Sequence, residues 1–120
     1  MKVTELRVKL YPEDFATSKQ FYKDILGFEI AREWDRGQTD KGVMFNTGSG
    51  VIELLSKGEK ENVKGCSLSL EVENVKALWE KLKDNATVVF ALRDNSWGDT
   101  SFCIADPGNF ELTFFTKTSK

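Results

Sequence analysis

Apolar and charged residues alternate strictly over residues 4–11, which is the period-two pattern of a β-strand with one packed face. Asp14 is suited to cap a helix, and apolar side chains then recur at helical spacing as far as Gly27, a residue that favours the left-handed end of a helix. The helix is predicted over residues 15–26. Three further strands are predicted over residues 28–32, 42–46 and 51–56. The first part of the chain, about residues 4–56, is therefore predicted to be a βαβββ module.

The same series returns after a polar segment, residues 57–65, which has the length of an exposed linker. Residues 66–72 alternate again, and Asn74 can cap a second helix. This helix carries Val75, Leu78, Trp79 and Leu82 at helical spacing, and three strands follow over residues 87–92, 100–105 and 110–115. A second βαβββ module is therefore predicted over about residues 66–116. Residues 1–120 are expected to form a single α+β domain.

Strand parity gathers polar side chains on the sheet face that lies away from the helices. The closing strands of both modules place a glutamate between two apolar residues, at Glu53 and at Glu111. Since the apolar neighbours should face the helices, both glutamates should face the other way. The same parity puts Arg7 and Ser67 on that face, which the twist of a sheet would make concave. A polar groove is therefore the predicted binding site.

Composition and charge exclude several classes of function. The net charge is -2 and its signs are interleaved, so the chain offers no basic stripe for nucleic acid. It has no apolar run that could cross a bilayer or serve as a secretory signal, so no membrane partner and a cytoplasmic location are expected. Cys66 and Cys103 form no C-x-x-C pair and are expected to be reduced and structural. Histidine is absent, so no site can use an imidazole.

Several short motifs fall in a fixed order along the predicted repeat. They are Phe21-Tyr22, Leu26-Gly27-Phe28, Trp97-Gly98, Asp106-Pro107 and Gly108-Asn109. With the doubled βαβββ pattern, they resemble the vicinal oxygen chelate superfamily, which includes glyoxalase I, bleomycin resistance proteins, fosfomycin resistance enzymes and extradiol dioxygenases. The resemblance implies a curled eight-stranded mixed sheet with helices on its outer face. It also implies a homodimer.

Metal-dependent members of that superfamily take their ligands from the first and last strands of each module. The resemblance assigns those positions to Arg7, Glu53, Ser67 and Glu111, with Thr113 as the alternative to Glu111. Arginine keeps its positive charge and would repel a divalent cation. A metal-free site without a cofactor is therefore expected, although a weak divalent cation site at Glu53 and Glu111 stays open.

Arg7 has two interpretations. With Lys9 it can grip an anionic group of a small molecule, or it can form a structural salt-bridge network with Glu53 and Glu111. Trp97 precedes a glycine in a loop and is the aromatic residue expected to close over the groove. The candidate ligand-binding residues are Arg7, Lys9, Tyr11, Glu53, Ser67, Trp97, Glu111 and Thr113, and Trp34 is a further aromatic candidate.

Three functions follow from these residues and from the resemblance. The first is a small-molecule-binding or sequestering protein similar to bleomycin resistance proteins, with a polar and aromatic cleft and no metal. The second is a metal-independent lyase or isomerase in which Glu53 or Glu111 is the catalytic base. The third is a dimerisation scaffold that holds no ligand.

Overall fold

In a computed structural model of the chain, residues 1–58 and 63–118 are described. The first series of elements is β1 (Arg7–Leu10), α1 (Phe15–Gln20), the π-helical turn η1 (Phe21–Ile25), β2 (Glu29–Asp35), β3 (Lys41–Asn46) and β4 (Val51–Leu55). The second is β5 (Ser67–Glu71), α2 (Val75–Leu82), β6 (Thr87–Asn95), β7 (Asp99–Ala105) and β8 (Glu111–Lys117). The predicted α+β fold with two βαβββ modules is confirmed.

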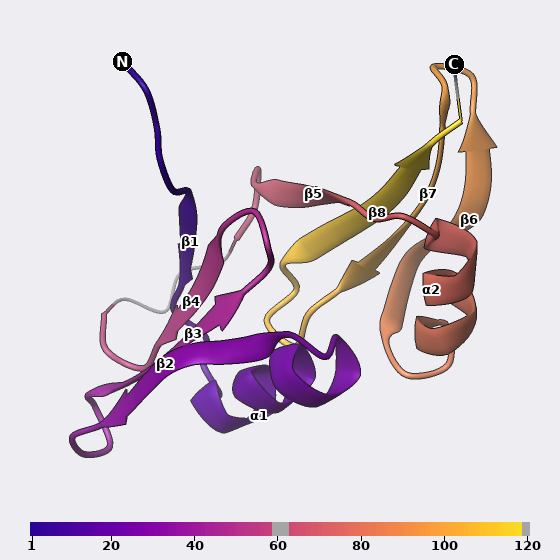
Figure 1. Ribbon diagram of the computed structural model, residues 1–120. Helices are drawn as coiled ribbons and strands as arrows, with labels where there is room; N and C mark the ends of the chain where they lie inside the picture. Colours follow the sequence, from indigo (N-terminus) through magenta and orange to yellow (C-terminus); the bar gives the residue numbers. More distant parts are fainter. Residues whose placement is uncertain (59–62, 119–120) are drawn as a thin grey trace. The chain divides into compact units, whose positions relative to one another are not determined.

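The chain divides into two compact units, Met1–Glu61 and Asn62–Lys120 (Figure 1). Each unit holds one four-stranded sheet, in the order β1-β4-β3-β2 or β5-β8-β7-β6. The first strand of each unit pairs in parallel with the last, and the remaining pairs are antiparallel, so both sheets are mixed. The division falls within the predicted linker, of which residues 59–62 lie outside the described part.

The first helix begins and ends where the sequence predicts, but it changes type along its length. Asp14 caps it by accepting a hydrogen bond from the Thr17 backbone N–H at 3.1 Å. After α1 the chain continues as the wider turn η1, and Gly27 then adopts a left-handed φ of 75°. Both Phe21 and Tyr22 of that turn are buried.

Each helix covers one face of the sheet in its own unit. In the first unit the rings of Tyr22 and Phe45 lie 5.9 Å apart, and in the second those of Trp79 and Phe102 lie 5.2 Å apart. The residues of the sheets that are fully buried on these helical sides are Val43, Phe45, Ile52, Leu54, Phe102, Ile104 and Leu112. Since side chains alternate along a strand, their neighbours point to the opposite face of each sheet.

Several strands differ in length from the prediction, and β2 and β8 continue to Asp35 and Lys117, past the predicted ends at residues 32 and 115. The first was expected from residue 4, but β1 begins at Arg7 and Leu6 is exposed. The sixth was expected to end at residue 92, whereas β6 continues to Asn95. Within the described residues, no helix is long and apolar enough to cross a membrane.

Candidate functional site

A row of four side chains crosses the first sheet on the face opposite its helix. Lys9 of β1 lies in register with Glu53 of β4, and Met44 of β3 is the partner of Glu53 on its other side. Arg32 of β2 completes the row beside Met44. Because Phe45 packs on the helical side, its neighbour Met44 and the other members of the row point away from the helix. We call these four residues the Glu53 row.

Glu53 is the most unusual residue of the row. It is only 7% exposed, and its buried Oε1 has no hydrogen-bond partner among the described residues. Lys9 is exposed and forms no ion pair with any described residue, although its strand position is beside Glu53. A buried carboxylate oxygen without a donor costs free energy, because it has lost the hydrogen bonds of water and gained none. The site therefore holds an unused acceptor.

A β-bulge brings Arg32 to this face. The register of β2 against β3 pairs Ile30 with Phe45 on the helical side and then Arg32 with Met44, so Ala31 is the extra residue. Without the bulge, simple alternation would turn Arg32 and Ile30 to the same side. Arg32 was not predicted as a site residue for this reason. Met44 was not predicted either, because an apolar strand residue is usually part of the core.

Trp34 forms an aromatic edge to the same face. A Cβ atom added to Gly42 would lie 2.1 Å from the indole Cζ2, so the ring of Trp34 rests directly on the glycine backbone. The guanidinium carbons of Arg32 and Arg36 lie 5.5 and 5.8 Å from the ring centroid, within cation–π range. Trp34 thus has a fixed place next to the Glu53 row.

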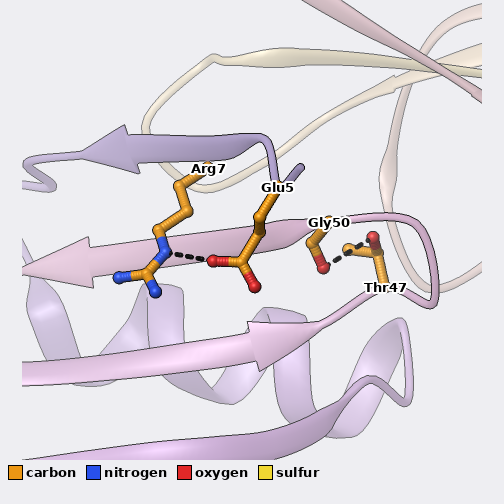
Figure 2. A network of polar contacts seen from close by, with 4 residues as sticks. All are labelled: Glu5, Arg7, Thr47 and Gly50. Carbon is orange, nitrogen blue, oxygen red and sulfur yellow. Dashed lines mark hydrogen bonds and ion pairs between the residues drawn. The ribbon is translucent and has the colours of Figure 1, made fainter. Parts of the chain in front are cut away.

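Arg7 has a nearer anionic partner than the sequence suggested. Its Nε donates to Glu5 Oε1 at 2.6 Å, and the two side chains are about half exposed (Figure 2). This hydrogen bond, followed by the charge of Glu5, raises the pKa of Arg7, and the charge of Glu53 adds a smaller effect. Among the described residues of the first unit, the ion-pair partner of Arg7 is Glu5 and not Glu53. A pairing of Arg7 with Glu111, which belongs to the other unit, stays a prediction.

Tyr11 follows β1 directly and is 38% exposed. A Cβ atom on Gly58 would lie 2.7 Å from its ring, so the tyrosine packs against the backbone at the end of the first unit. The first unit thus holds five of the predicted candidates, Arg7, Lys9, Tyr11, Glu53 and the further aromatic candidate Trp34.

The other candidates belong to the second unit, where Ser67 and Glu111 are register partners and are both exposed. The register pairs Arg7 with Val51 and Ser67 with Glu111, so equivalent residues of these strands are 60 positions apart. The counterpart of Glu53 is consequently Thr113, which was predicted as the alternative to Glu111. Glu111 corresponds to Val51.

Thr113 is the centre of a row equivalent to the Glu53 row. Its partners are Ser69 on β5 and Cys103 on β7, and Phe90 on β6 lies beside Cys103. We call these the Thr113 row. Burial raises the pKa of the Cys103 thiol, which keeps it protonated and a poor nucleophile. Both cysteines are free, but Cys66 is exposed rather than part of the core.

Trp97 lies in the turn between β6 and β7 and is 72% exposed. Its indole N–H donates to Asp99 Oδ2 at 3.1 Å, and Asn95 donates to the other oxygen of the same carboxylate at 2.7 Å. The ring is therefore held by hydrogen bonds while most of its surface stays free.

The donor set of the Glu53 row does not suit a divalent cation. Glu53 is the single carboxylate of the row, and two of the other three residues, Lys9 and Arg32, are cations. Among the described residues, no three His, Cys, Asp or Glu side chains gather closely enough to hold a metal ion. Hard cations need several oxygen ligands, so the side chains of this row do not fit a metal-dependent step.

The sequence matches the model of the Glyoxalase/Bleomycin resistance protein/Dioxygenase superfamily over residues 6–114. No curated protein matches the chain significantly.

Solved structures share the fold at low sequence identity. TnmS3, an antibiotic binding protein from Streptomyces sp. CB03234, has a TM-score of 0.80 and 16% identity, with 98% of each chain covered. TioX from Micromonospora sp. ML1 has a TM-score of 0.75 and 18% identity, again with 98% of each chain covered. A superfamily member from Sphaerobacter thermophilus DSM 20745 has a TM-score of 0.79 and 17% identity, covering 98% of this chain and 99% of its own. These likenesses concern the fold.

Proposed function

Because the chain belongs to the Glyoxalase/Bleomycin resistance protein/Dioxygenase superfamily, we propose that it binds a small organic molecule without a metal and without turnover. The binding surface is the face of the first sheet that carries the Glu53 row. The observation behind this proposal is the buried Oε1 of Glu53, which has no hydrogen-bond partner among the described residues. A ligand that donates a hydrogen bond there removes the cost of that unpaired oxygen.

The surroundings of Glu53 fit a small molecule better than a structural role for its charge. Met44, which is 8% exposed, and Trp34 supply apolar atoms on the same face, and Lys9 and Arg32 supply charges on exposed side chains. A few polar groups among apolar ones are typical of ligand sites. The fold of TnmS3, an antibiotic binding protein, supports the same class of function.

A ligand screen tests the proposal. Thermal shift with panels of anionic, neutral and cationic organic compounds, each with and without a chelator, is expected to give hits that survive chelation. Isothermal titration should then show saturable binding that weakens in Glu53→Met but not in Glu73→Met, the same change at an exposed glutamate of the second unit. If no compound of any charge class binds, or if the two variants weaken binding equally, the proposal fails.

A metal-independent lyase or isomerase is the second candidate, because a carboxylate with a free oxygen can also accept a proton from a substrate. Mass spectrometry of each hit after incubation with the protein separates the two functions. An unchanged ligand supports binding alone. A product that forms in the presence of chelator and is lost in Glu53→Gln supports catalysis. If the protein is folded and binds none of the compounds, the dimerisation scaffold is the function that remains.

The proposal also includes the cellular location and the oligomeric state of the protein. We place the protein in the cytoplasm, where its two free cysteines stay reduced. We also expect a homodimer, as the superfamily resemblance implies, and light scattering coupled to gel filtration measures this directly.

A further inference from the structure

We infer that the ligand is an α-hydroxy acid with an apolar tail, whose hydroxyl donates to Glu53, whose carboxylate pairs with Lys9 and whose tail lies over Met44 toward Trp34. This inference rests on the proposed function and names the chemical class that fits the Glu53 row.

The hydrogen-bond donor group of the ligand is inferred from Glu53. Its Oε1 is a buried acceptor without a partner among the described residues, so the ligand must present an O–H or N–H group. The row already carries two cations, Lys9 and Arg32, beside one carboxylate. A further positive charge on the ligand would meet both, whereas a hydroxyl satisfies the oxygen without adding charge.

The carboxylate of the ligand is inferred from Lys9 and from the position of Lys9 next to Glu53. Lys9 is in register with Glu53 on the adjacent strand, and adjacent strands lie about 4.8 Å apart. Side chains that leave the sheet from neighbouring positions can together reach a hydroxyl and a carboxylate on adjacent carbons. Lys9 has no ion-pair partner in the described part of the chain, so its charge is available, whereas Arg7 is bound to Glu5.

The apolar tail of the ligand is inferred from Met44 and from Trp34, which lies next to the row. Met44 lies on the side of Glu53 opposite Lys9, and the indole of Trp34 lies on Gly42, the strand neighbour that shares the face with Met44. An aryl or alkyl group attached to the hydroxy acid therefore meets apolar atoms in that direction. Lys9 and Arg32 are exposed and have several rotatable bonds, so their side chains can move aside to admit the ligand.

Phenyllactate, hydrocinnamate and phenyllactamide form a matched set of probes for calorimetry. Hydrocinnamate lacks only the hydroxyl, and phenyllactamide lacks only the negative charge. Phenyllactate is expected to bind about tenfold to a hundredfold more tightly than hydrocinnamate, as suits a hydrogen bond to a charged acceptor. Glu53→Met should abolish that preference, whereas Glu73→Met, the same change at an exposed glutamate of the second unit, should keep it.

Lys9→Met tests the second contact. It should weaken both acids by the same factor, about tenfold, and leave phenyllactamide unchanged, while Lys76→Met on the exposed side of α2 changes nothing. Far-ultraviolet circular dichroism of each variant confirms that it is folded.

The outcomes separate the ligand class from the function. Equal binding of phenyllactate and hydrocinnamate, or binding of neither, overturns the inferred class. If cationic or neutral compounds then bind in the broader screen, small-molecule binding still stands. If no compound binds in the broader screen, both the inferred ligand class and the proposed small-molecule binding fail.

Discussion

The two units share a strand plan but differ in chemistry at the same place. In the first, the central row is Lys9, Glu53, Met44 and Arg32, and in the second it is Ser69, Thr113, Cys103 and Phe90. The first row combines a buried unpaired carboxylate with two cations, whereas the second is uncharged. A repeated fold can hold either row, so the charged one needs an explanation beyond folding. We propose ligand binding as that explanation.

The largest expected effect concerns the packing of Trp34 in the first unit. Gly42→Ala places a Cβ atom 2.1 Å from the indole, so the ring must leave its position. We expect a loss of about 2 kcal/mol in the free energy of unfolding, as for other overpacked sites. Denaturant titration measures it, together with a shift in tryptophan fluorescence.

Gly108→Ala is the matched change in the second unit. An added Cβ atom there meets only Asp106 Oδ1, at an ordinary 3.5 Å, so its effect should stay below about 1 kcal/mol. Equal losses in the two variants would mean that Trp34 does not hold the position described.

The next effect concerns the charge of Glu53. Replacing it by Met keeps the length of the side chain and removes a buried charge, so Glu53→Met should raise the free energy of unfolding by about 1 kcal/mol. Thr113→Val, in the equivalent row, should change it by less than about 0.5 kcal/mol. Denaturant titration of the ligand-free proteins compares them. A destabilised Glu53→Met would indicate that the carboxylate has a structural partner.

The smallest effect concerns the two helix caps. Asp14 and Asn74 both accept a hydrogen bond at 3.1 Å from the backbone three residues later, but only Asp14 titrates. The hydrogen bonds from Thr17 lower the pKa of Asp14. Its cap therefore stabilises the protein fully above its unfolded pKa of about 3.9 and is lost as the pH falls through the lower folded value.

Exchanging the caps tests that difference. Asp14→Asn should make the melting temperature less sensitive to acid below about pH 4, and Asn74→Asp should make it more sensitive. Melting curves across the acid range decide this. Identical profiles for the native chain and both variants would contradict it.

Much of the fold could be predicted because local signals agree with it. Alternation marked the strands, Asp14 and Asn74 marked the helix starts, and Gly27 marked a helix end. The π-helical turn η1 was not predicted, because the apolar spacing of Phe21 and its neighbours suits either helix type.

The candidate site was predicted in part. Alternation alone placed Glu53 opposite the helix, but the bulge at Ala31 depends on strand pairing and reverses the side on which Arg32 lies. The sequence motif around Glu111 suggested equivalence with Glu53, whereas the register aligns Glu53 with Thr113. The pairing of Arg7 with Glu5 was also hidden, because a pair two residues apart depends on the local path of the chain before β1.

A crystal structure of the protein with phenyllactate tests the role of Glu53 most directly. The predicted result is a hydroxyl oxygen within about 3 Å of Glu53 Oε1, with the carboxylate at Lys9 and the ring over Met44. A ligand bound elsewhere, or a protein side chain that donates to Oε1 in its place, would contradict it.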